Sequence, residues 1–567
     1  MGSDRPRGSA PRTGAQTAFD YDLAIVGSGG AAFSAAIAAR RADLRVVMIE
    51  RGTVGGTCVN VGCIPSKALL AAAESRHRAD SARFPGVRTA GGPVDFVALI
   101  AGKDVIVERL RQQKYVDIAA RQGIEIIEGD AHFLDGPALD VDGRRIEAAH
   151  YLLATGAEPA IPEIPGLADS GFLTSTTAME LEELPESLIV IGGGYVAMEQ
   201  AQLFAHLGTH VTMLVRSKLA RAEEPQIGET IQQAFEAEGI IVHEGLTPNR
   251  VVRDGDEVIV SGAGRELRAE HVLVATGRRP RTEGLGLEAV GVDIGHGGEV
   301  VVDDDLSTSN PRVWAAGDVT GHPQFVYVAA KHGGLVVENA FDGAGKRIDY
   351  TALPRITFTN PTIASAGLTE AQALDQGIEC SCRTLPLEHV PRAIVSRNTG
   401  GLVKLVAERE SGRIVGAHLI GAGAGDVILA ASLAIQTGMT VEQLASGWNP
   451  YLTLGEGSPW RHRPSPATPA SSPAARHEHA PQSPHRDRGR RRARRGRIAA
   501  ISAGTDSKRA DTPRVSAVGP GASRGLSAAG RRRSARSRER RQARSAWLGS
   551  DIGRGTRRLR VGRSARR

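Results

Sequence analysis

Cysteine is scarce in this chain of 567 residues, and long apolar runs are absent. The four cysteines, Cys58, Cys63, Cys380 and Cys382, are too few and too clustered for the disulfide framework of a secreted protein. No apolar run reaches the length of about 18 residues that a membrane span needs. Residues 1–20 lack the apolar core of a signal peptide. These absences favour a cytoplasmic protein without membrane contact.

Aromatic residues make up only 4% of the chain, whereas glycine occurs 68 times. That balance favours an α/β protein with many tight turns between strands and helices. The chain is too long for a single hydrophobic core, so the sequence predicts about three or four domains.

Acidic residues nearly disappear after residue 457. Residues 458–567 contain 30 Lys or Arg and 6 Asp or Glu, which gives this segment a charge of +24. Because the net charge of the chain is +7, the rest of the chain has a charge of −17. We expect this segment and residues 1–19 to be disordered. The basic segment is either the product of a frameshift near codon 457 or a nucleic-acid-binding tail that attracts phosphates.

Two segments about 165 residues apart each have the order strand, glycine-rich turn, helix, strand. The expected strands are residues 22–26, 44–50, 187–191 and 210–215, and the expected helices are residues 31–41 and 196–207. Such a unit binds the pyrophosphate of a dinucleotide at the N-terminus of its helix. Residues 351–457 mix short strands with a helix at 426–437 and are expected to form a separate α+β domain.

The first glycine-rich turn fits FAD or NAD better than NADP. Gly27 permits the tight turn, Gly29 lets the backbone approach a pyrophosphate, and Ala32 allows close packing of the helix. Glu50 ends the second strand, where its carboxylate can accept hydrogen bonds from an unphosphorylated ribose. The alternative is a glycine-rich turn in some other α/β domain.

The second turn places Gly192, Gly194 and Ala197 at the same spacing. The residues after its second strand are basic, namely Arg216, Lys218 and Arg221. Basic groups at that point pair with a ribose 2′-phosphate, so NADPH is favoured. A solvated basic loop is the alternative.

Cys58 and Cys63 lie five residues apart at the start of an expected helix. They can form a disulfide only if the first turn is distorted, and Gly62 and Pro65 make that distortion plausible. A helix N-terminus also favours a thiolate. A metal site would need two further ligands, which no neighbouring Cys or His supplies. Two buried structural cysteines are the remaining alternative.

Residues 55–67 resemble the redox-active motif of the flavoprotein disulfide reductases, which are pyridine nucleotide-disulfide oxidoreductases. The resemblance covers about residues 20–457 and includes residues 154–156, 275–280 and 315–318. It implies an α/β fold with two doubly wound, Rossmann-like domains for FAD and NAD(P)H, an α+β dimerisation domain, and a homodimer. The implied parts are a leader at 1–19, an FAD domain at 20–157 and 281–350, an NADPH domain at 158–280, a truncated dimerisation domain at 351–457, and a tail at 458–567.

The resemblance also implies roles for individual residues. Cys63 is the thiolate beside the flavin, and Cys58 is the exchanging thiol. Lys67 pairs with Glu199 near flavin N5, while Tyr195 covers the flavin until the nicotinamide displaces it. The implied FAD positions are Gly27, Gly29, Ala32, Glu50, Gly52, Thr57, Lys67, Ala131, Thr155, Gly156, Asp318 and Val326, with Asp318 at the ribityl chain. The implied NADPH positions are Gly192, Gly194, Tyr195, Ala197, Arg216, Lys218, Arg221 and Gly277.

Tyr451 stands where the thiol-reducing members carry a histidine that protonates the leaving thiolate. A tyrosine hydroxyl shuttles protons poorly at neutral pH. Reducing thiolate-bound Hg(II) needs no such proton, and Hg(II) prefers sulfur ligands. Four runs resemble the mercuric reductases of the family: residues 324–330, 390–393, 439–445 and 450–457. We therefore expect NADPH-dependent reduction of Hg(II) to Hg(0), with Cys58 and Cys63 binding the Hg(II) transiently.

The chain departs from that pattern at both ends. Residues 1–20 cannot form the N-terminal metal-binding domain of many mercuric reductases, and no cysteine after Gly457 can replace the family's C-terminal delivery pair. The resemblance therefore implies impaired activity. The alternatives are a dihydrolipoyl dehydrogenase-like reductase or a transhydrogenase, and an inactive FAD-binding protein with a nucleic-acid-binding tail.

Cys380 and Cys382 are alternate residues of an expected strand and so share one face. They could bind a soft metal ion together, or they could simply be two small strand residues.

Overall fold

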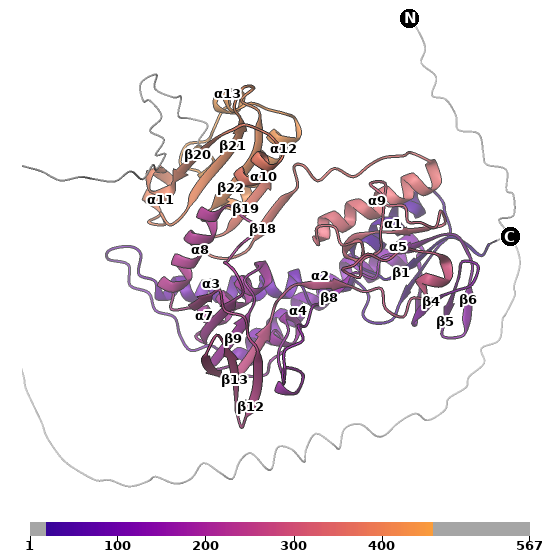
Figure 1. Ribbon diagram of the computed structural model, residues 1–567, viewed down its shortest axis with the longest axis horizontal. Coiled ribbons are helices and arrows are strands. Elements are labelled where there is room, and N and C mark those ends of the chain that lie inside the picture. Colours follow the sequence, from indigo (N-terminus) through magenta and orange to yellow (C-terminus); the bar gives the residue numbers. More distant parts are fainter. Residues whose placement is uncertain (1–18, 458–567) are drawn as a thin grey trace, which may run out of the picture. The chain divides into compact units, whose positions relative to one another are not determined.

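The structure is a computed structural model that describes residues 19–457 (Figure 1). Residues 1–18 and 458–567 lie outside the described part of the chain. The expectations for the leader and for the basic tail therefore fall outside it and remain predictions.

The first sheet is parallel and joins strands that are far apart in the sequence. Its order is β17-β7-β1-β2-β3, so β17 returns to pair with β7 after the whole second nucleotide-binding segment. The strands are β1 (Tyr21–Val26), β2 (Val46–Glu50), β3 (Glu125–Glu128), β7 (Ala148–Leu153) and β17 (Val313–Ala315). Four consecutive residues of β1 are buried, as expected for a parallel strand covered on both faces.

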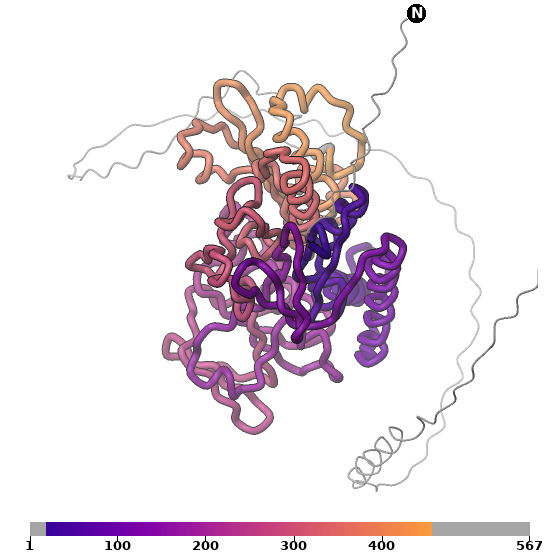
Figure 2. Tube along the Cα trace, turned by 90° about the vertical axis from the view of Figure 1, so that its right-hand side faces the viewer, coloured from indigo at the N-terminus to yellow at the C-terminus, as the bar shows by residue number. Residues whose placement is uncertain are grey.

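Helices α1 (Gly30–Arg41) and α9 (Val326–Asp342) pack side by side against this sheet (Figures 1 and 2). Small residues bring the two helices together, because a Cβ at Gly333 would overlap the backbone of Ala31 and Ala35. The other helices of this part are α2 (Gly56–Asn60), α3 (Cys63–Asp80), α4 (Phe96–Arg111), the π-helical turn η1 (Gln112–Val116), α5 (Asp117–Gln122), η3 (Leu287–Val290) and η4 (Gly317–Thr320). An antiparallel sheet is formed by β4 (Ala131–Leu134), β5 (Ala138–Val141) and β6 (Arg144–Ile146).

The second nucleotide-binding unit has a four-stranded parallel sheet of order β11-β10-β9-β15. Its strands are β9 (Ser187–Ile191), β10 (His210–Val215), β11 (Ile241–Glu244) and β15 (His271–Val274). The strands β12 (Arg250–Asp254), β13 (Glu257–Gly262) and β14 (Arg265–Ala269) form an antiparallel sheet. The helices are η2 (Ala168–Ser170), α6 (Ser175–Ala178), α7 (Tyr195–Leu207) and α8 (Pro225–Ala237). Two short strands, β8 (Ala157–Pro159) and β16 (Arg278–Pro280), pair where the chain enters and leaves this unit.

The last unit is a five-stranded antiparallel sheet of order β18-β19-β22-β21-β20. Its strands are β18 (Pro354–Thr357), β19 (Ile363–Gly367), β20 (Cys380–Pro386), β21 (Leu402–Glu408) and β22 (Ile414–Ile420). Its helices are α10 (Glu370–Asp375), η5 (Leu387–His389), α11 (Pro391–Val395), α12 (Ala424–Gln436), α13 (Val441–Ser446) and η6 (Leu454–Gly457). α12 packs on β19 and β22, where its residues Ile428, Ala431 and Ile435 join the core of this unit.

The predicted fold class, two doubly wound nucleotide-binding sheets and an α+β unit, is confirmed. The expected strand 44–50 begins later, at Val46, because the backbone N–H of Arg45 donates to the Asp22 carboxylate. Among residues 19–457, no helix combines the length and apolar character that crossing a membrane requires.

Candidate active site

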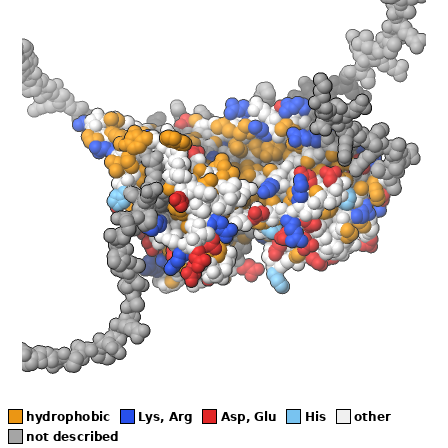
Figure 3. Space-filling view, turned by 90° about the horizontal axis from the view of Figure 1, so that it is seen from above, with side chains coloured by type: hydrophobic (Ala, Val, Ile, Leu, Met, Phe, Trp, Pro, Cys, Tyr) orange, Lys and Arg blue, Asp and Glu red, His pale blue; other side chains and the backbone are white. Residues whose placement is uncertain are grey.

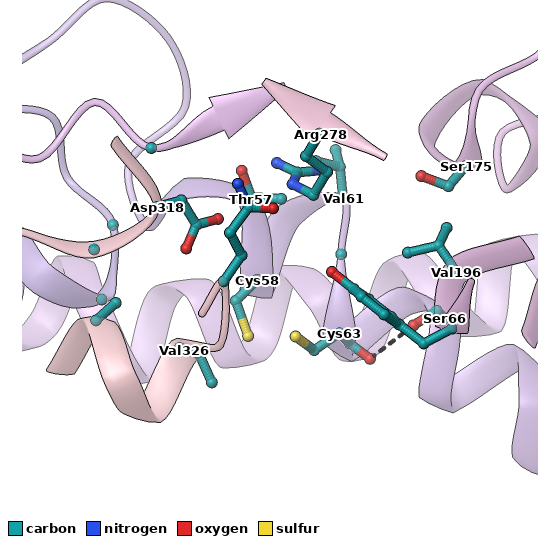
Figure 4. Close-up of a pocket in the computed structure, with 18 of the residues that line it drawn as sticks. Thr57, Cys58, Val61, Cys63, Ser66, Ser175, Val196, Arg278, Asp318 and Val326 are labelled. Carbon is teal, nitrogen blue, oxygen red and sulfur yellow. Dashed lines mark hydrogen bonds between the residues drawn. The ribbon is translucent and has the colours of Figure 1, made fainter. Parts of the chain in front are cut away.

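One cavity brings together most of the residues to which redox and flavin roles were assigned (Figure 4). Its walls come from the start of α1, the break between α2 and α3, the start of α7, and η4. The predicted residues that line it are Gly29, Thr57, Cys58, Cys63, Lys67, Gly156, Tyr195, Glu199, Asp318 and Val326. The fold thus gathers short segments from across more than half of the described chain around the two thiols.

Cys58 and Cys63 lie on different helices, and a break between these helices brings their side chains together. Cys58 is the middle residue of the short helix α2, and α3 begins at Cys63. Gly62 makes the break possible, because a Cβ there would lie 2.9 Å from the carbonyl oxygen of Thr57. Figure 4 shows the two sulfur atoms facing each other across the cavity. Both cysteines carry free thiols in this structure.

The two thiols differ in acidity. A hydrogen bond from Cys58 and the nearby charge of Lys67 lower the pKa of Cys63 to about 7. The same hydrogen bond, together with burial, raises the pKa of Cys58. The reduced pair therefore carries one thiolate, on Cys63, in a substantial fraction of molecules at neutral pH.

Lys67 is held beside the thiols by two contacts, and a third contact joins their two partners. Its Nζ lies 2.6 Å from Oε2 of the buried Glu199, and it lies over the ring of Phe358 at 4.7 Å from the centroid. The other oxygen of Glu199, Oε1, accepts a hydrogen bond of 2.9 Å from the backbone N–H of Phe358. Lys67 on α3 is therefore a positioned positive charge, fixed by α7 and by the residue that follows β18.

The first glycine-rich turn leaves a cradle that any side chain would fill. Gly27 has φ +106°, and a Cβ there would overlap the carbonyl of Ala154. A Cβ at Gly56 would lie 2.6 Å from the Cα of Gly29, so the turn and the start of α2 touch backbone to backbone. Gly29 caps α1 without a side-chain hydrogen bond, which leaves the first N–H groups of the helix available to a phosphate.

Glu50 shapes the end of this cradle. Its Oε2 accepts a 2.5 Å hydrogen bond from Ser28 Oγ, and its Oε1 accepts a 2.8 Å bond from the backbone N–H of Gly52. The carboxylate keeps lone pairs for a ribose hydroxyl. The open helix N-terminus, the glycine cradle and this carboxylate together fit the pyrophosphate and ribose of FAD.

Asp318 is the buried acid of the cavity. It lies in η4, and burial raises its pKa, although the charge of Arg278 opposes that shift. Arg278 also lines the cavity, and its guanidinium donates to the carbonyl of Ala157. Arg278 was not among the predicted site residues. Its position directly after Gly277 was the only sequence signal, since its proximity to Asp318 depends on the fold.

The second glycine-rich turn repeats the first. Gly192 has φ +140°, and Gly194 caps α7 without a side-chain hydrogen bond. Of the basic residues that follow β10, Lys218 and Arg221 border a second cavity together with Glu244. Lys218 Nζ lies 4.0 Å from Glu244 Oε2 and is mostly exposed.

The remaining predicted residues lie outside the lining of the first cavity. Those of the flavin set are Gly27, Ala32, Glu50, Gly52, Ala131 and Thr155. Those of the nicotinamide set are Gly192, Gly194, Ala197, Arg216, Lys218, Arg221 and Gly277. Tyr451 is 74% exposed and is not brought to the thiols by its own chain. Other lining residues that the sequence did not indicate are Ser175, Met179 and Gln200.

Comparison with known proteins identifies relatives along most of the described chain. The family described as pyridine nucleotide-disulphide oxidoreductase matches residues 21–333, and the dimerisation domain of that family matches residues 353–462. A mercuric reductase of Streptomyces lividans is 59% identical over 446 residues, which are 77% of this chain and 94% of that protein. A mercuric reductase of Staphylococcus aureus is 47% identical over 77% of this chain and 81% of that protein.

Solved structures agree with these matches. The HOCl-induced flavoprotein disulfide reductase RclA of Escherichia coli, in a Cu(II) complex, superposes with a TM-score of 0.71 at 29% identity, over 77% of this chain and 97% of that one. LpdA of Mycobacterium tuberculosis gives a TM-score of 0.70 at 27% identity, over 77% and 98% of the two chains. The match to the dimerisation domain supports a homodimer. This chain belongs to the pyridine nucleotide-disulphide oxidoreductase family, as its sequence predicts, and is an oxidoreductase that uses FAD and a pyridine nucleotide.

Proposed function

We propose that this protein reduces Hg(II) to Hg(0) with electrons from NADPH, through FAD and the pair Cys58 and Cys63. The observation that carries the proposal is the position of this pair in a chain 59% identical to a mercuric reductase over 94% of that protein. The balanced reaction consumes one NADPH and one Hg(II) and yields NADP⁺, one proton and Hg(0).

Cys63 and Cys58 are the proposed ligands of the substrate. Hg(II) is a soft ion that prefers thiolate sulfur. With a pKa of about 7, Cys63 supplies a thiolate without a separate base. Cys58 loses its proton when the metal ion binds, because metal binding displaces thiol protons. Bound FAD supplies the two-electron relay between the nicotinamide and this pair.

Lys67 and Glu199 are proposed to set the charge around the pair. The ammonium group is fixed 2.6 Å from Glu199 Oε2 and cannot swing into solvent without leaving a buried carboxylate unpaired. It therefore stabilises negative charge on Cys63. Tyr195 lies at the start of α7 and lines the same cavity, which supports its proposed role as a cover over the flavin.

The preference for NADPH is proposed from the charges after β10. Arg216, Lys218 and Arg221 follow the strand end where a ribose 2′-phosphate would lie. Glu244 offsets part of this charge through its ion pair with Lys218.

We also propose that the protein acts as a cytoplasmic homodimer.

The decisive assay measures Hg(II)-dependent oxidation of NADPH by the purified full chain and the release of volatile Hg(0). Lipoamide and glutathione disulfide serve as competing substrates, and NADH as the competing donor. We expect Hg(II) and NADPH to be preferred. Cys58→Ala and Cys63→Ala should each lower the rate at least about a hundredfold, whereas Cys380→Ala, outside the cavity, should leave it unchanged.

A comparison variant should carry a C-terminal cysteine pair in place of residues 458–567. We expect the unaltered chain to be slower than this variant, because no cysteine follows Gly457. If the variant binds FAD and accepts electrons from NADPH but shows no mercury-dependent rate, the substrate assignment is wrong. Faster turnover with lipoamide than with Hg(II) would favour a dihydrolipoyl dehydrogenase-like enzyme instead.

A further inference from the structure

A second group of potential metal ligands lies in the dimerisation domain. Cys380 and Cys382 are alternate residues of β20, the edge strand of the sheet, and their side chains point to the same face. The Cys382 thiol donates a hydrogen bond to Cys380 Sγ over 3.6 Å, and neither cysteine is in a disulfide. The pair lies outside the redox cavity lining and contributes nothing to the proposed mercury chemistry.

Glu370 completes a set of three ligands. The Thr369 side chain caps α10, which places Glu370 in the first turn of the helix beside β20. One carboxylate oxygen of Glu370 and the two sulfur atoms all lie within 4.8 Å of one another. Two thiols and a carboxylate are a ligand set that suits thiophilic divalent ions.

The spacing of the sulfur atoms favours tetrahedral coordination. With metal–sulfur bonds of about 2.3 Å, two thiolates on a tetrahedral ion are separated by about 3.8 Å. A linear ion with bonds of the same length would hold them about 4.6 Å apart. The observed 3.6 Å is close to the tetrahedral value and needs only a small rearrangement. Glu370 would be the third ligand, which leaves one position for water or another donor.

The charges around the cluster also suit a divalent ion. The buried Lys404 Nζ lies 2.7 Å from Oε2 of Glu224 and 2.7 Å from Oε2 of Glu370. One ammonium and two carboxylates leave the cluster with one negative charge while both thiols are protonated. A divalent ion replaces the two thiol protons and leaves that charge unchanged. Binding therefore releases protons without electron transfer and does not require the Lys404 ion pairs to break.

The cluster of Cys380, Cys382 and Glu370 is buried against apolar side chains on one side and accessible to solvent on the other. Cys380 and Cys382 pack against Val406, Val415 and Leu368, so their inner side is apolar. The Glu370 side chain is 44% exposed and Cys382 is half-buried, so an ion can reach the site from solvent.

From these observations we infer that Cys380, Cys382 and Glu370 bind one thiophilic divalent metal ion that accepts tetrahedral coordination, of the Zn²⁺ and Cd²⁺ class. The site is separate from Cys58 and Cys63, and it does not depend on whether the protein reduces Hg(II).

The test uses the full chain with Cys58→Ser and Cys63→Ser, so that Cys380 and Cys382 are the remaining thiols of the four. Cd²⁺ is the probe, with equilibrium dialysis, metal analysis and ultraviolet absorbance as readouts. We expect one tightly bound Cd²⁺ per chain and a thiolate-to-metal absorption band. Adding Cys380→Ser and Cys382→Ser should weaken binding at least about a hundredfold and remove the band.

Glu370→Gln should weaken binding by about tenfold but keep the thiolate band. The matched control is Glu379→Gln, because Glu379 is next to Cys380 but points to solvent at 79% exposure. That control should bind like its parent. The variant that lacks all four cysteines could unfold, which flavin content and circular dichroism would reveal. In that case Cys382→Ser is added alone to the Cys58→Ser and Cys63→Ser protein, and this variant should also lose most of the band.

Two outcomes would overturn the inference. One is the absence of tight Cd²⁺ binding in the folded protein that retains Cys380 and Cys382. The other is binding that survives loss of both cysteines but is lost in His206→Ala, which would assign the ion to the His77, His206 and Glu238 group between α3, α7 and α8.

Discussion

At the scale of single residues, the acidity of Cys63 depends on opposing neighbours. The hydrogen bond from Cys58 and the charge of Lys67 lower its pKa, whereas burial and the charge of Glu199 raise it. Because the resulting pKa is about 7, the thiolate is present above neutral pH and is lost as the pH falls through that value. Lys67 and Glu199 therefore act on the same thiol with opposite sign.

This opposition predicts that two conservative variants shift the titration in opposite directions. Lys67→Gln removes a positive charge and should raise the pKa of Cys63, while Glu199→Gln removes a negative charge and should lower it. The measurement is the thiolate-to-flavin absorbance of the two-electron-reduced protein, titrated from about pH 5 to about pH 9. Each shift should be on the order of one pH unit.

The control for this titration is Glu163→Gln, because Glu163 is exposed and lies outside the cavity. It should leave the midpoint unchanged. Shifts of the same sign in Lys67→Gln and Glu199→Gln would contradict the electrostatic account.

The sequence alone predicted Cys58 and Cys63 as the redox pair, because their spacing within a glycine-rich segment is itself the signal. Arg278 could not be found in this way. It lies 40 residues before Asp318 in the sequence, and its charge affects the pKa of Asp318 only because the fold brings the two side chains together. His332 is a similar case. It is fully buried in α9, and its Nδ1 accepts the backbone N–H of Gly317, but no sequence pattern predicted that contact.

At the scale of elements, the first nucleotide turn and the redox helix support each other. Gly56 opens α2 with φ +67°, and a Cβ there would lie 2.6 Å from Gly29 Cα. The same contact positions the pyrophosphate cradle relative to Cys58, which lies two residues further along α2. Cofactor binding and thiol placement are therefore linked through one backbone contact.

We predict that Gly56→Ala lowers both FAD content and stability. The left-handed φ alone should cost about 1–2 kcal/mol, and separating the two backbones adds to that cost. FAD per chain, from visible absorbance, and thermal unfolding measure the two effects. The control Gly102→Ala in α4, where a Cβ would meet nothing within 4 Å, should be neutral or stabilising by up to about 1 kcal/mol. Full FAD content and unchanged unfolding in Gly56→Ala would contradict the prediction.

Elements with a strong hydrophobic pattern were predictable, and weakly patterned ones were not. The strands Ser187–Ile191 and His210–Val215 have the expected bounds, and the helix after the second turn begins only one residue earlier than expected. The antiparallel strands β12 to β14 were not predicted. β14 has just one buried residue among five, so its sequence carries little of the signal that burial produces.

At the scale of the whole molecule, apolar side chains remain exposed on the dimerisation domain. Leu429 and Leu433 of α12 are 60% and 51% exposed, and they lie four residues apart on one face of the helix. Figure 3 shows hydrophobic side chains in groups, with charged residues between them, on the face that it presents. Exposed apolar groups of this kind mark a surface that another molecule covers.

The resemblance to the family predicted a homodimer but not the surface through which it forms. That surface depends on which side of α12 faces the core. Ile428, Ala431 and Ile435 point inward, which leaves Leu429 and Leu433 outside. Tyr451, a candidate site residue from the sequence, is also mostly exposed in a single chain, so its part in the reaction remains a prediction.

We therefore predict that the combined change Leu429→Glu and Leu433→Glu converts the dimer into monomers. Two carboxylates on a surface that must be desolvated should weaken association by several kcal/mol, so that the dimer dissociates at micromolar concentration. Sedimentation velocity measures the change. The matched control is Ile241→Glu on β11, which adds a charge at a similarly exposed apolar position of the second nucleotide-binding unit and should remain dimeric. If the α12 variant is still a dimer while the control behaves as expected, the two chains associate through another surface. If the variant is a folded, FAD-containing monomer without mercury-dependent activity, the reaction requires residues from both chains.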